Sequence, residues 1–230
     1  MSCTKSRSLI GESELNFGEL KVMQHYLSDI AAHYVRGSLG LDGEDEWLIE
    51  QGRAQGLRMH RFKRSELPRV SKCIGILKGL SPSSLLDVGS GRGAFLWTLL
   101  SELPDVEVTC VDVLSHRVEL INTVRRGGLT RVGAMECDVQ QMPFKDKSFD
   151  LACALEVLEH LLEPAKAVRE LSRITRDWLL VSVPSKPDDN PEHVQLFSSS
   201  DLDALLLENG AVSVQSYSVL NHRIALAKLS

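Results

Sequence analysis

The residue types best suited to chemistry in this chain are two carboxylates and two histidines in its second half. Glu156, Glu159 and His160 are spaced three and four residues apart, which places them on one face if a helix begins there. His193 follows on a later polar stretch. Carboxylate oxygens and imidazole nitrogens together suit a divalent cation such as Mg or Mn. We therefore predict a metal site formed by these four residues.

The same residues can also be interpreted without a metal. Without one, His160 or His193 is the candidate catalytic base, because imidazole titrates near neutrality. Asp188 and Asp189, on the same stretch as His193, are weaker candidate ligands. Carboxylates and histidines at such positions can also serve only to hold loops through hydrogen bonds. The pattern by itself leaves a metal site, a metal-free base and a structural role open.

A glycine-rich loop is the second chemical feature. The segment DVGSGRG, residues 87–93, follows a short apolar run and precedes a helical pattern over residues 94–100. Its G-x-G-x-G spacing differs from the G-x-G-x-x-G of dinucleotide-binding loops, and the preceding Asp87 favours a cation-bearing ligand. Glycines let backbone approach a ligand without an intervening side chain. The small residues predicted to contact the ligand are Gly89, Ser90, Gly91 and Gly93.

Two more carboxylates end the next two apolar runs. Asp112 stands 25 residues after Asp87, where a carboxylate can accept hydrogen bonds from both hydroxyls of a ribose. Asp138 ends the following run and is placed to accept from an adenine amino group. Each alone could equally be a helix N-cap or a turn residue. In this order after a glycine loop, they predict a ligand with a ribose and an adenine.

These residues need a scaffold that brings the ends of the apolar runs together. From residue 83 onwards, short apolar runs alternate with helical patterns, which predicts a parallel sheet covered on both faces. The carboxyl ends of such strands form the active edge of α/β proteins. The last two runs, residues 211–219 and 223–229, are separated only by residues 220–222. This spacing predicts a hairpin whose last strand is antiparallel, at or near the sheet edge.

The chain before this region is predicted to be helical. Apolar residues recur at helical spacing from Leu20 to Ala31, and further helices are expected over residues 44–55 and 68–79. We divide the chain into an N-terminal helical extension, residues 1–80, and a second domain, residues 81–230. The extension is expected to form a lid and the substrate region.

Charge is distributed unevenly along the chain. Residues 53–78 carry eight Lys or Arg and one acidic residue, although the whole chain has a net charge of −5. This stretch could hold a phosphate-bearing substrate. Alternatively, it could form a solvated basic face that balances the charge of the acidic residues 1–52. Within it, residues 60–64 mix aromatic and basic groups. That mixture suits contact with a phosphate or nucleotide, and equally suits packing against the sheet.

Composition excludes several classes of protein. With 43% apolar and 25% charged residues, the chain is neither disordered nor low in complexity. No apolar run approaches the roughly 20 residues that span a bilayer, and the N-terminus resembles no signal peptide, so no membrane partner is expected. Five cysteines without a C-x-x-C pair argue against disulfides and cysteine zinc sites. We expect a reducing, cytoplasmic location.

Taken together, DVGSGRG, VTCVDV, CDVQQMPFKDKSFDL and ALEVLEHL resemble motifs of class I S-adenosylmethionine-dependent methyltransferases, over residues 83–229. The resemblance implies a Rossmann-like fold: a doubly wound, mostly parallel α/β sheet of seven strands with an antiparallel last strand. It also implies S-adenosylmethionine as cofactor. The residues it places around that cofactor are Asp87, Gly89, Ser90, Gly91, Gly93, Asp112, Val113, Asp138, Val139, Leu155 and Glu156.

Within that set, the resemblance assigns a part of the cofactor to each strand end. Asp87 would lie near the methionine part through water or backbone, and Asp112 would hold the ribose. Asp138 and Val139 would hold the adenine. Leu155 and Glu156, which end the fourth strand, would lie beside the methionine end.

The E-x-x-E-H cluster with a later histidine resembles two methyltransferase groups that use a divalent metal. One methylates the 3′-terminal ribose 2′-oxygen of small RNAs, and the other methylates catechol-type intermediates of ubiquinone synthesis. In both, a metal can grip two neighbouring oxygens and lower the pKa of one. The RNA group carries a denser histidine run than this chain, which offers only His193 there.

The acceptor is predicted to be an oxygen of a small molecule or an RNA. After the fourth strand the chain reads Leu155–Glu156–Val157–Leu158, without the Asn/Asp-Pro-Pro-aromatic motif common in amine and amide methylation. The alternatives are metal-free transfer to another acceptor and a non-catalytic, cofactor-binding partner subunit. A nicotinamide oxidoreductase is disfavoured by the glycine spacing and the terminal hairpin.

Overall fold

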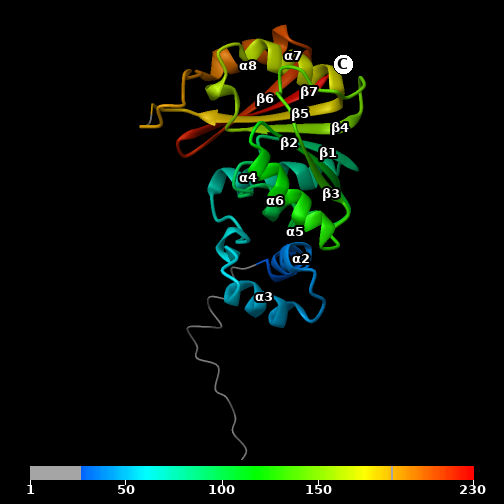
Figure 1. Cartoon of the computed structure of the whole chain (residues 1–230). Helices are drawn as coiled ribbons and strands as arrows, with labels where there is room; N and C mark the ends of the chain where they lie inside the picture. Colours follow the sequence, from blue (N-terminus) through cyan, green and yellow to red (C-terminus); the bar gives the residue numbers. More distant parts are fainter. Residues whose placement is uncertain (1–26, 188) are drawn as a thin grey trace, which may run out of the picture.

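The computed structural model describes residues 27–187 and 189–230, and its centre is a seven-stranded sheet (Figure 1). The strand order is β3-β2-β1-β4-β5-β7-β6. Neighbouring strands from β3 to β5 are parallel, whereas β7 is antiparallel to both β5 and β6. The predicted α/β fold with an antiparallel last strand is confirmed. The strands are β1 Ser84–Val88, β2 Glu107–Asp112, β3 Val132–Glu136, β4 Phe149–Leu155, β5 Thr175–Pro184, β6 Ala211–Val219 and β7 His222–Leu229.

Successive residues of the central strands enter two different apolar layers. On β1, Leu85 lies in one buried cluster and Leu86 in the other. Because helices cover both faces of the sheet, its strands are apolar throughout instead of alternating with polar residues. Figure 1 shows these helical layers on opposite sides. One layer contains α4 Pro68–Leu80, α5 Leu96–Glu102 and α6 Ser115–Arg126, and the other contains α7 Pro164–Ile174 and α8 Ser199–Glu208.

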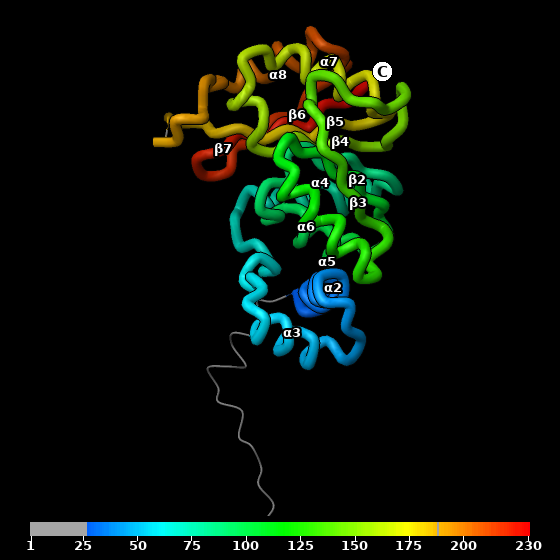
Figure 2. Tube along the Cα trace, viewed as in Figure 1, coloured from blue at the N-terminus to red at the C-terminus, as the bar shows by residue number. Residues whose placement is uncertain are grey.

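The N-terminal helices α2 Ser28–Leu39 and α3 Asp45–Ala54 lie on the side of α6 away from the sheet (Figures 1 and 2). Close approach of α2 to α6 depends on glycine: a Cβ on Gly37 would lie 1.9 Å from the Thr123 carbonyl oxygen. One buried cluster runs from α2 through to the sheet. The predicted helices over residues 44–55 and 68–79 are confirmed as α3 and α4. Residues 20–26 of the first predicted helix lie outside the described residues.

The predicted terminal hairpin is confirmed, with its turn at residues 220–221. Leu220 adopts a left-handed backbone with φ of +49°. The last strand, β7, is inserted between β5 and β6, so the edge strand is β6.

No helix in the described ranges is both long and apolar enough to cross a membrane. The cysteines at positions 73, 110, 137 and 153 are free thiols, and Cys3 lies outside the described residues.

Candidate functional site

The loop after β1 owes its shape to three glycines with left-handed backbone. Gly89, Gly91 and Gly93 have φ values of +66°, +57° and +81°. A Cβ on Gly93 would lie 2.0 Å from Nε1 of Trp97, and one on Gly89 would lie 2.8 Å from a methyl of Val157. Beside Gly91 the nearest atom would be 3.6 Å away. Gly89 and Gly93 are thus required by packing, whereas Gly91 leaves an open approach to the backbone.

Asp87, at the end of β1, is buried with one oxygen unsatisfied. The residue is 2% exposed, and its Oδ2 has no hydrogen-bond partner among the described residues. Burial raises the pKa of Asp87 to about 7; the Ser90 hydroxyl opposes this rise, and the charge of Asp112 adds to it. A buried acid oxygen that lacks a donor fits a cationic ligand group such as an ammonium.

A cleft of about 210 Å³ borders Asp87 and the glycine loop. Its walls come from the ends of β1, β4 and β5, from α4 and from the start of α6. Gly93 is not among its lining residues, because it packs against Trp97. The predicted cofactor residues that line the cleft are Asp87, Gly89, Ser90, Gly91, Leu155 and Glu156.

Asp112, at the end of β2, ties the glycine loop to α6. Its Oδ1 accepts from the Leu114 amide at 3.0 Å. Its Oδ2 accepts from the Gly91 amide at 3.3 Å and from Arg117 at 3.4 Å. Arg117 also lines the cleft, whereas Asp112 does not, and neighbouring Val113 is 63% exposed. A ribose hydroxyl would therefore share Asp112 with Arg117 or displace it.

Asp138 and Val139 lie at the same sheet edge, after β3. The Cys137 amide donates to the Asp112 carbonyl at 3.1 Å, which brings the segment beside the end of β2. Asp138 is exposed, and its Oδ1 accepts from the Gln140 amide at 2.8 Å. The Val139 side chain is 6% exposed and packs into the core. Neither residue lines the 210 Å³ cleft.

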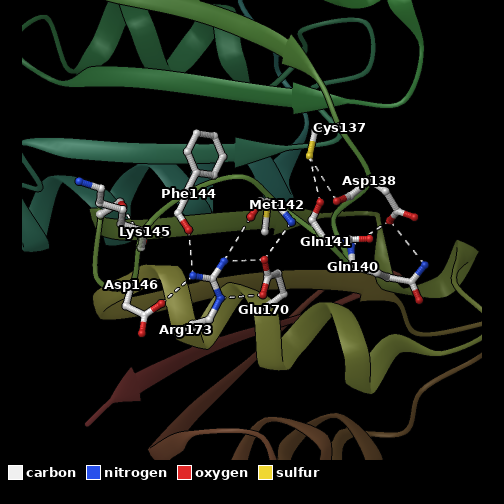
Figure 3. Close-up of polar contacts among 11 residues, drawn as sticks. Cys137, Asp138, Gln140, Gln141, Met142, Phe144, Lys145, Asp146, Glu170 and Arg173 are labelled. Carbon is white, nitrogen blue, oxygen red and sulfur yellow. Dashed lines mark hydrogen bonds and ion pairs between the residues drawn. The ribbon is translucent and has the colours of Figure 1, made fainter.

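The loop after β3 is held in place by an arginine on α7 (Figure 3). Arg173 donates to the carbonyl oxygens of Phe144 and Met142, at 2.8 and 3.2 Å, and pairs with Asp146 at 2.6 Å. Glu170 accepts from the Met142 amide at 2.8 Å. Hydrogen bonding to Arg173 lowers the pKa of Glu170. This network fixes the path of the loop that carries the predicted adenine-binding residues.

Glu156 follows β4 in a left-handed conformation, with φ of +59°. The Ser182 hydroxyl donates to its Oε1 at 2.7 Å. His222 Nε2 lies 3.1 Å from Oε2, and Arg69 Nε lies 4.0 Å from Oε1. These partners belong to β5, β7 and α4. The carboxylate of Glu156 therefore helps to close the cleft.

The expectation of one helical face from Glu156 to His160 is wrong. Glu156 is left-handed, and only the short 3₁₀ helix η2 Leu158–His160 follows it. A left-handed residue redirects the chain, so the spacing of an α-helix does not apply across it. Glu156 is consequently not part of the group that Glu159 and His160 form with His193.

That group brings one ligand atom from each of Glu159, His160 and His193 within 4.8 Å of one another. Glu159 is 0% exposed, and both histidines are half-buried. His160 Nδ1 lies 2.9 Å from the Glu192 carbonyl oxygen, so the neutral ring carries its hydrogen there. The lone pair then lies on Nε2, as a metal ligand or a base requires. A buried carboxylate beside two imidazoles is a donor set that fits a divalent cation.

The weaker candidates do not join this group. Asp189 is exposed and absent from it, and Asp188 lies outside the described residues.

Four residues at the cleft were not expected from the sequence. Of these four, only Ser182 stands out in the sequence as a candidate site residue, because it is a polar residue inside an apolar run. The other three stand at positions with ordinary explanations, such as a helix surface or a hairpin turn. The four residues are Arg69, Arg117, Ser182 and His222.

Residues 86–178 match the family described as "Methyltransferase domain". The "Probable S-adenosylmethionine-dependent methyltransferase MT3114" of Mycobacterium tuberculosis is 31% identical over 136 residues, which cover 55% of this chain and 47% of that protein. The O-methyltransferase rstn1 of Aspergillus nomiae is 27% identical over 201 residues, which cover 80% of this chain and 83% of that protein.

Among solved structures, the methyltransferase domain of bacterial CtHen1-C superposes with a TM-score of 0.59 at 19% identity. The superposition covers 71% of this chain and 97% of that one, and it shows the same fold. This chain matches about half the length of MT3114. The matched family segment contains the glycine loop, Asp112, Asp138 and Glu159, but not His193.

Proposed function

We propose that this chain transfers the methyl group of S-adenosylmethionine to an oxygen of its acceptor. The observation that carries the proposal is the cradle at the end of β1. Three left-handed glycines shape the loop there, two of them (Gly89 and Gly91) line the cleft, and buried Asp87 presents an oxygen without a hydrogen-bond partner among the described residues. The match of residues 86–178 to the methyltransferase-domain family supports it.

The residues present fit this cofactor part by part. Asp87 suits the ammonium of its methionine, and Asp112 at the end of β2 suits the ribose. The loop with Asp138 would take the adenine. When bound, the cofactor supplies a methyl group on a positively charged sulfur. The chain must then hold the acceptor oxygen in line with that methyl and accept the acceptor's proton.

Oxygen is the favoured acceptor atom for two reasons. The relative with the broad overlap, rstn1, is named an O-methyltransferase. The turn after β4 lacks the Asn/Asp-Pro-Pro-aromatic motif, and Glu156 occupies it instead.

The group of Glu159, His160 and His193 supports a divalent metal, Mg or Mn, as part of this proposal. These three side chains would hold the cation, and the acceptor would approach it with its oxygens. A bound metal supplies positive charge that lowers the pKa of an acceptor hydroxyl. The Glu192 carbonyl orients His160 for this role through Nδ1.

A metal-free reaction is the second candidate, and the same hydrogen bond favours it. Because Nδ1 of His160 is engaged by the Glu192 carbonyl, Nε2 is the atom that would accept a proton. Exhaustive chelation separates the two mechanisms. Activity that persists without metal would exclude the metal mechanism and leave a histidine as the base, with His160 the favoured one.

The test of the proposed function is binding and turnover on the full chain. By calorimetry, S-adenosylhomocysteine should bind and NAD should not. Asp112→Ala should weaken S-adenosylhomocysteine about tenfold or more, because hydrogen bonds to a charged group contribute roughly 1.5–3 kcal/mol. Label from methyl-labelled S-adenosylmethionine should enter an acceptor in cell extract. Absence of S-adenosylhomocysteine binding would refute the function, whereas binding without turnover would indicate a non-catalytic partner subunit.

A further inference from the structure

A second pocket adjoins the cofactor cleft and is strongly basic. It has a volume of about 610 Å³, against about 210 Å³ for the cofactor cleft. Two histidines also line it, and no carboxylate is among its lining residues. In a chain with a net charge of −5, this concentration of positive charge is local. The cationic residues that line it are Arg58, Arg61, Lys63, Arg64, Arg92 and Arg117.

The basic loop of this pocket is anchored by apolar residues. Residues Met59 and Phe62, in and after the 3₁₀ helix η1 Met59–Arg61, are buried, while their neighbours line the pocket. The Phe62 ring lies between Tyr34 and Trp97, at centroid distances of 5.0 and 5.2 Å. The Ser65 amide donates to the Thr98 hydroxyl at 2.9 Å. Packing and basic contact, which the sequence left as alternatives, are therefore divided between different residues of one segment: Met59 and Phe62 pack inside, and the residues between and beside them line the pocket.

Three of the arginines are available to a ligand. Arg64 pairs with Glu102, and Arg117 pairs with Asp112. Within the described ranges, the guanidinium groups of Arg58, Arg61 and Arg92 form no hydrogen bond or ion pair, and all three line this pocket. Arginine binds phosphate oxygens in a two-pronged geometry. Arg58 and Arg61 lie on the anchored loop and Arg92 lies on the glycine loop, so three uncommitted arginines converge on one pocket and suit a ligand with several negative charges.

The pocket adjoins the cofactor cleft and shares with it one predicted cofactor contact, Gly91. Its lining omits Asp112, Asp138 and Glu156. Gly91, Arg92, Ala94 and Arg117 line both hollows, so a ligand in one would lie beside a ligand in the other.

We infer that this basic pocket binds the phosphate groups of the methyl acceptor, and that the acceptor is a compact phosphorylated molecule of about nucleotide size. The inference rests on the proposed function, because it assigns the second ligand of the same site. Compactness follows from the size of the pocket: its volume of about 610 Å³ is in the range of pockets that enclose small-molecule ligands.

The first test uses inorganic tripolyphosphate as a probe, by calorimetry on the full chain. Arg58→Ala combined with Arg61→Ala should weaken its binding at least about tenfold, at about 0.15 M salt. Neither residue lines the cofactor cleft, so binding of S-adenosylhomocysteine should stay unchanged. The matched control is Lys166→Ala with Arg169→Ala, which removes the same charge from an exposed surface of α7. Equal weakening in both double variants, or no binding by the wild type, would overturn the inference.

Two further arms connect the pocket to the acceptor. Tripolyphosphate should bind equally well when S-adenosylhomocysteine saturates the chain; loss of binding would place the anion in the cofactor cleft and overturn the inference. Transfer of labelled methyl to a small-molecule filtrate of cell extract should disappear after phosphatase treatment. Transfer that survives this treatment, or that occurs only in the retained RNA fraction, would also overturn it. Failure of S-adenosylhomocysteine binding would instead count against the proposed function, while the tripolyphosphate result still decides whether the pocket binds anions.

Discussion

Two groups of ionisable residues share the carboxyl edge of the sheet and are built differently. Asp87 and Asp112 end neighbouring strands, so the hydrogen-bond register of β1 and β2 fixes where they lie. Glu159 and His160 lie on the short helix η2, and His193 lies on the connection before α8. The first group depends on one rigid sheet. The second depends on two connections that meet, and such connections are where proteins vary their function.

The first group also shows how unequal two strand-end carboxylates can be. Asp112 accepts three hydrogen bonds, two of them from backbone amides, whereas one oxygen of Asp87 has no partner among the residues described. Both side chains are buried. Asp112 therefore holds the loop together in the absence of any ligand, while one oxygen of Asp87 can still accept a hydrogen bond from a positively charged group. Asp112 thus organises the loop in addition to its proposed role toward the ribose, whereas Asp87 is poised for the charged end of the ligand.

The largest effect should come from filling the open side of the glycine loop. Gly91→Val should remove binding of S-adenosylhomocysteine, because a branched side chain would occupy the approach to the backbone. A valine held at the left-handed φ of this position should lower the free energy of unfolding by only about 1–3 kcal/mol. Calorimetry and chemical denaturation measure the two quantities. Normal ligand binding by this variant would show that the loop is not the cofactor cradle.

Gly93→Val is the matched control for that substitution. A Cβ at Gly93 collides with Trp97, so this variant should lose stability before it loses any ligand contact. If both variants behaved alike, the distinction between a packing glycine and a ligand glycine would be lost.

The next effect tests whether the two groups of residues are chemically separate. Glu159→Gln should weaken Mn²⁺ binding at least about tenfold and leave S-adenosylhomocysteine binding unchanged, because Glu159 belongs to the histidine group. Glu156→Gln should weaken S-adenosylhomocysteine instead, since Glu156 lines the cofactor cleft. Titration calorimetry with each ligand gives both affinities. If both variants lost Mn²⁺ affinity equally, Glu156 would have to be counted as a metal ligand.

Asp87 should make cofactor binding depend on pH. Its pKa is raised from 3.8 to about 7, so a cationic ligand meets a charged Asp87 only as the pH rises through 7. Affinity for S-adenosylhomocysteine should increase about tenfold between pH 6 and 8, because the ionised fraction of an acid with a pKa of about 7 rises from about 0.1 to about 0.9 over this range. Asp87→Asn should bind weakly and without this slope. A wild-type affinity that is flat over the range would contradict the role of Asp87.

The same group should also make stability depend on pH. Between about pH 4 and 7 the folded state holds a proton that the unfolded state has lost, so stability should fall as the pH rises through this window. Asp87→Asn should abolish that decline. Denaturant titrations of both proteins at several pH values provide the measurement.

The smallest effect concerns the loop after β3. Glu170→Gln should lower the free energy of unfolding by about 1 kcal/mol at pH 7, because it weakens the hydrogen bonds to Arg173 and to the Met142 amide. The pKa of Glu170 is lowered in the fold, so this difference should shrink as the pH falls through that pKa. S-adenosylhomocysteine binding should weaken only slightly. An unchanged stability would mean that the network does not hold the loop.

Local pattern was sufficient for most of the scaffold. Apolar runs of strand length that alternate with helical periods predicted the parallel sheet, and the short connection at residues 220–222 predicted the hairpin. Glycine spacing predicted the loop, since left-handed backbone at three positions is accessible mainly to glycine. These features depend on residues close together in the chain, and a sequence displays such neighbours directly.

The second group shows where local pattern fails. Spacing predicted a helical face that included Glu156, but Glu156 follows β4 in a left-handed conformation and only one short 3₁₀ helix comes after it. Ser182, His222 and Arg69 hold that turn from three separate elements. No spacing rule relates these residues to Glu156, because they approach it only when the sheet is assembled.

The sequence alone determined the fold class, the glycine loop and the carboxylates at the ends of β1 and β2, because periodicity, glycine and strand ends act within short stretches of chain. Only the tertiary structure decided which carboxylates have partners, that Glu159 meets two histidines, and that the basic residues 58–64 face a pocket while Phe62 anchors them. Burial and charge pairing arise from contacts between distant segments. Those contacts set the chemistry of a side chain whose type the sequence already shows.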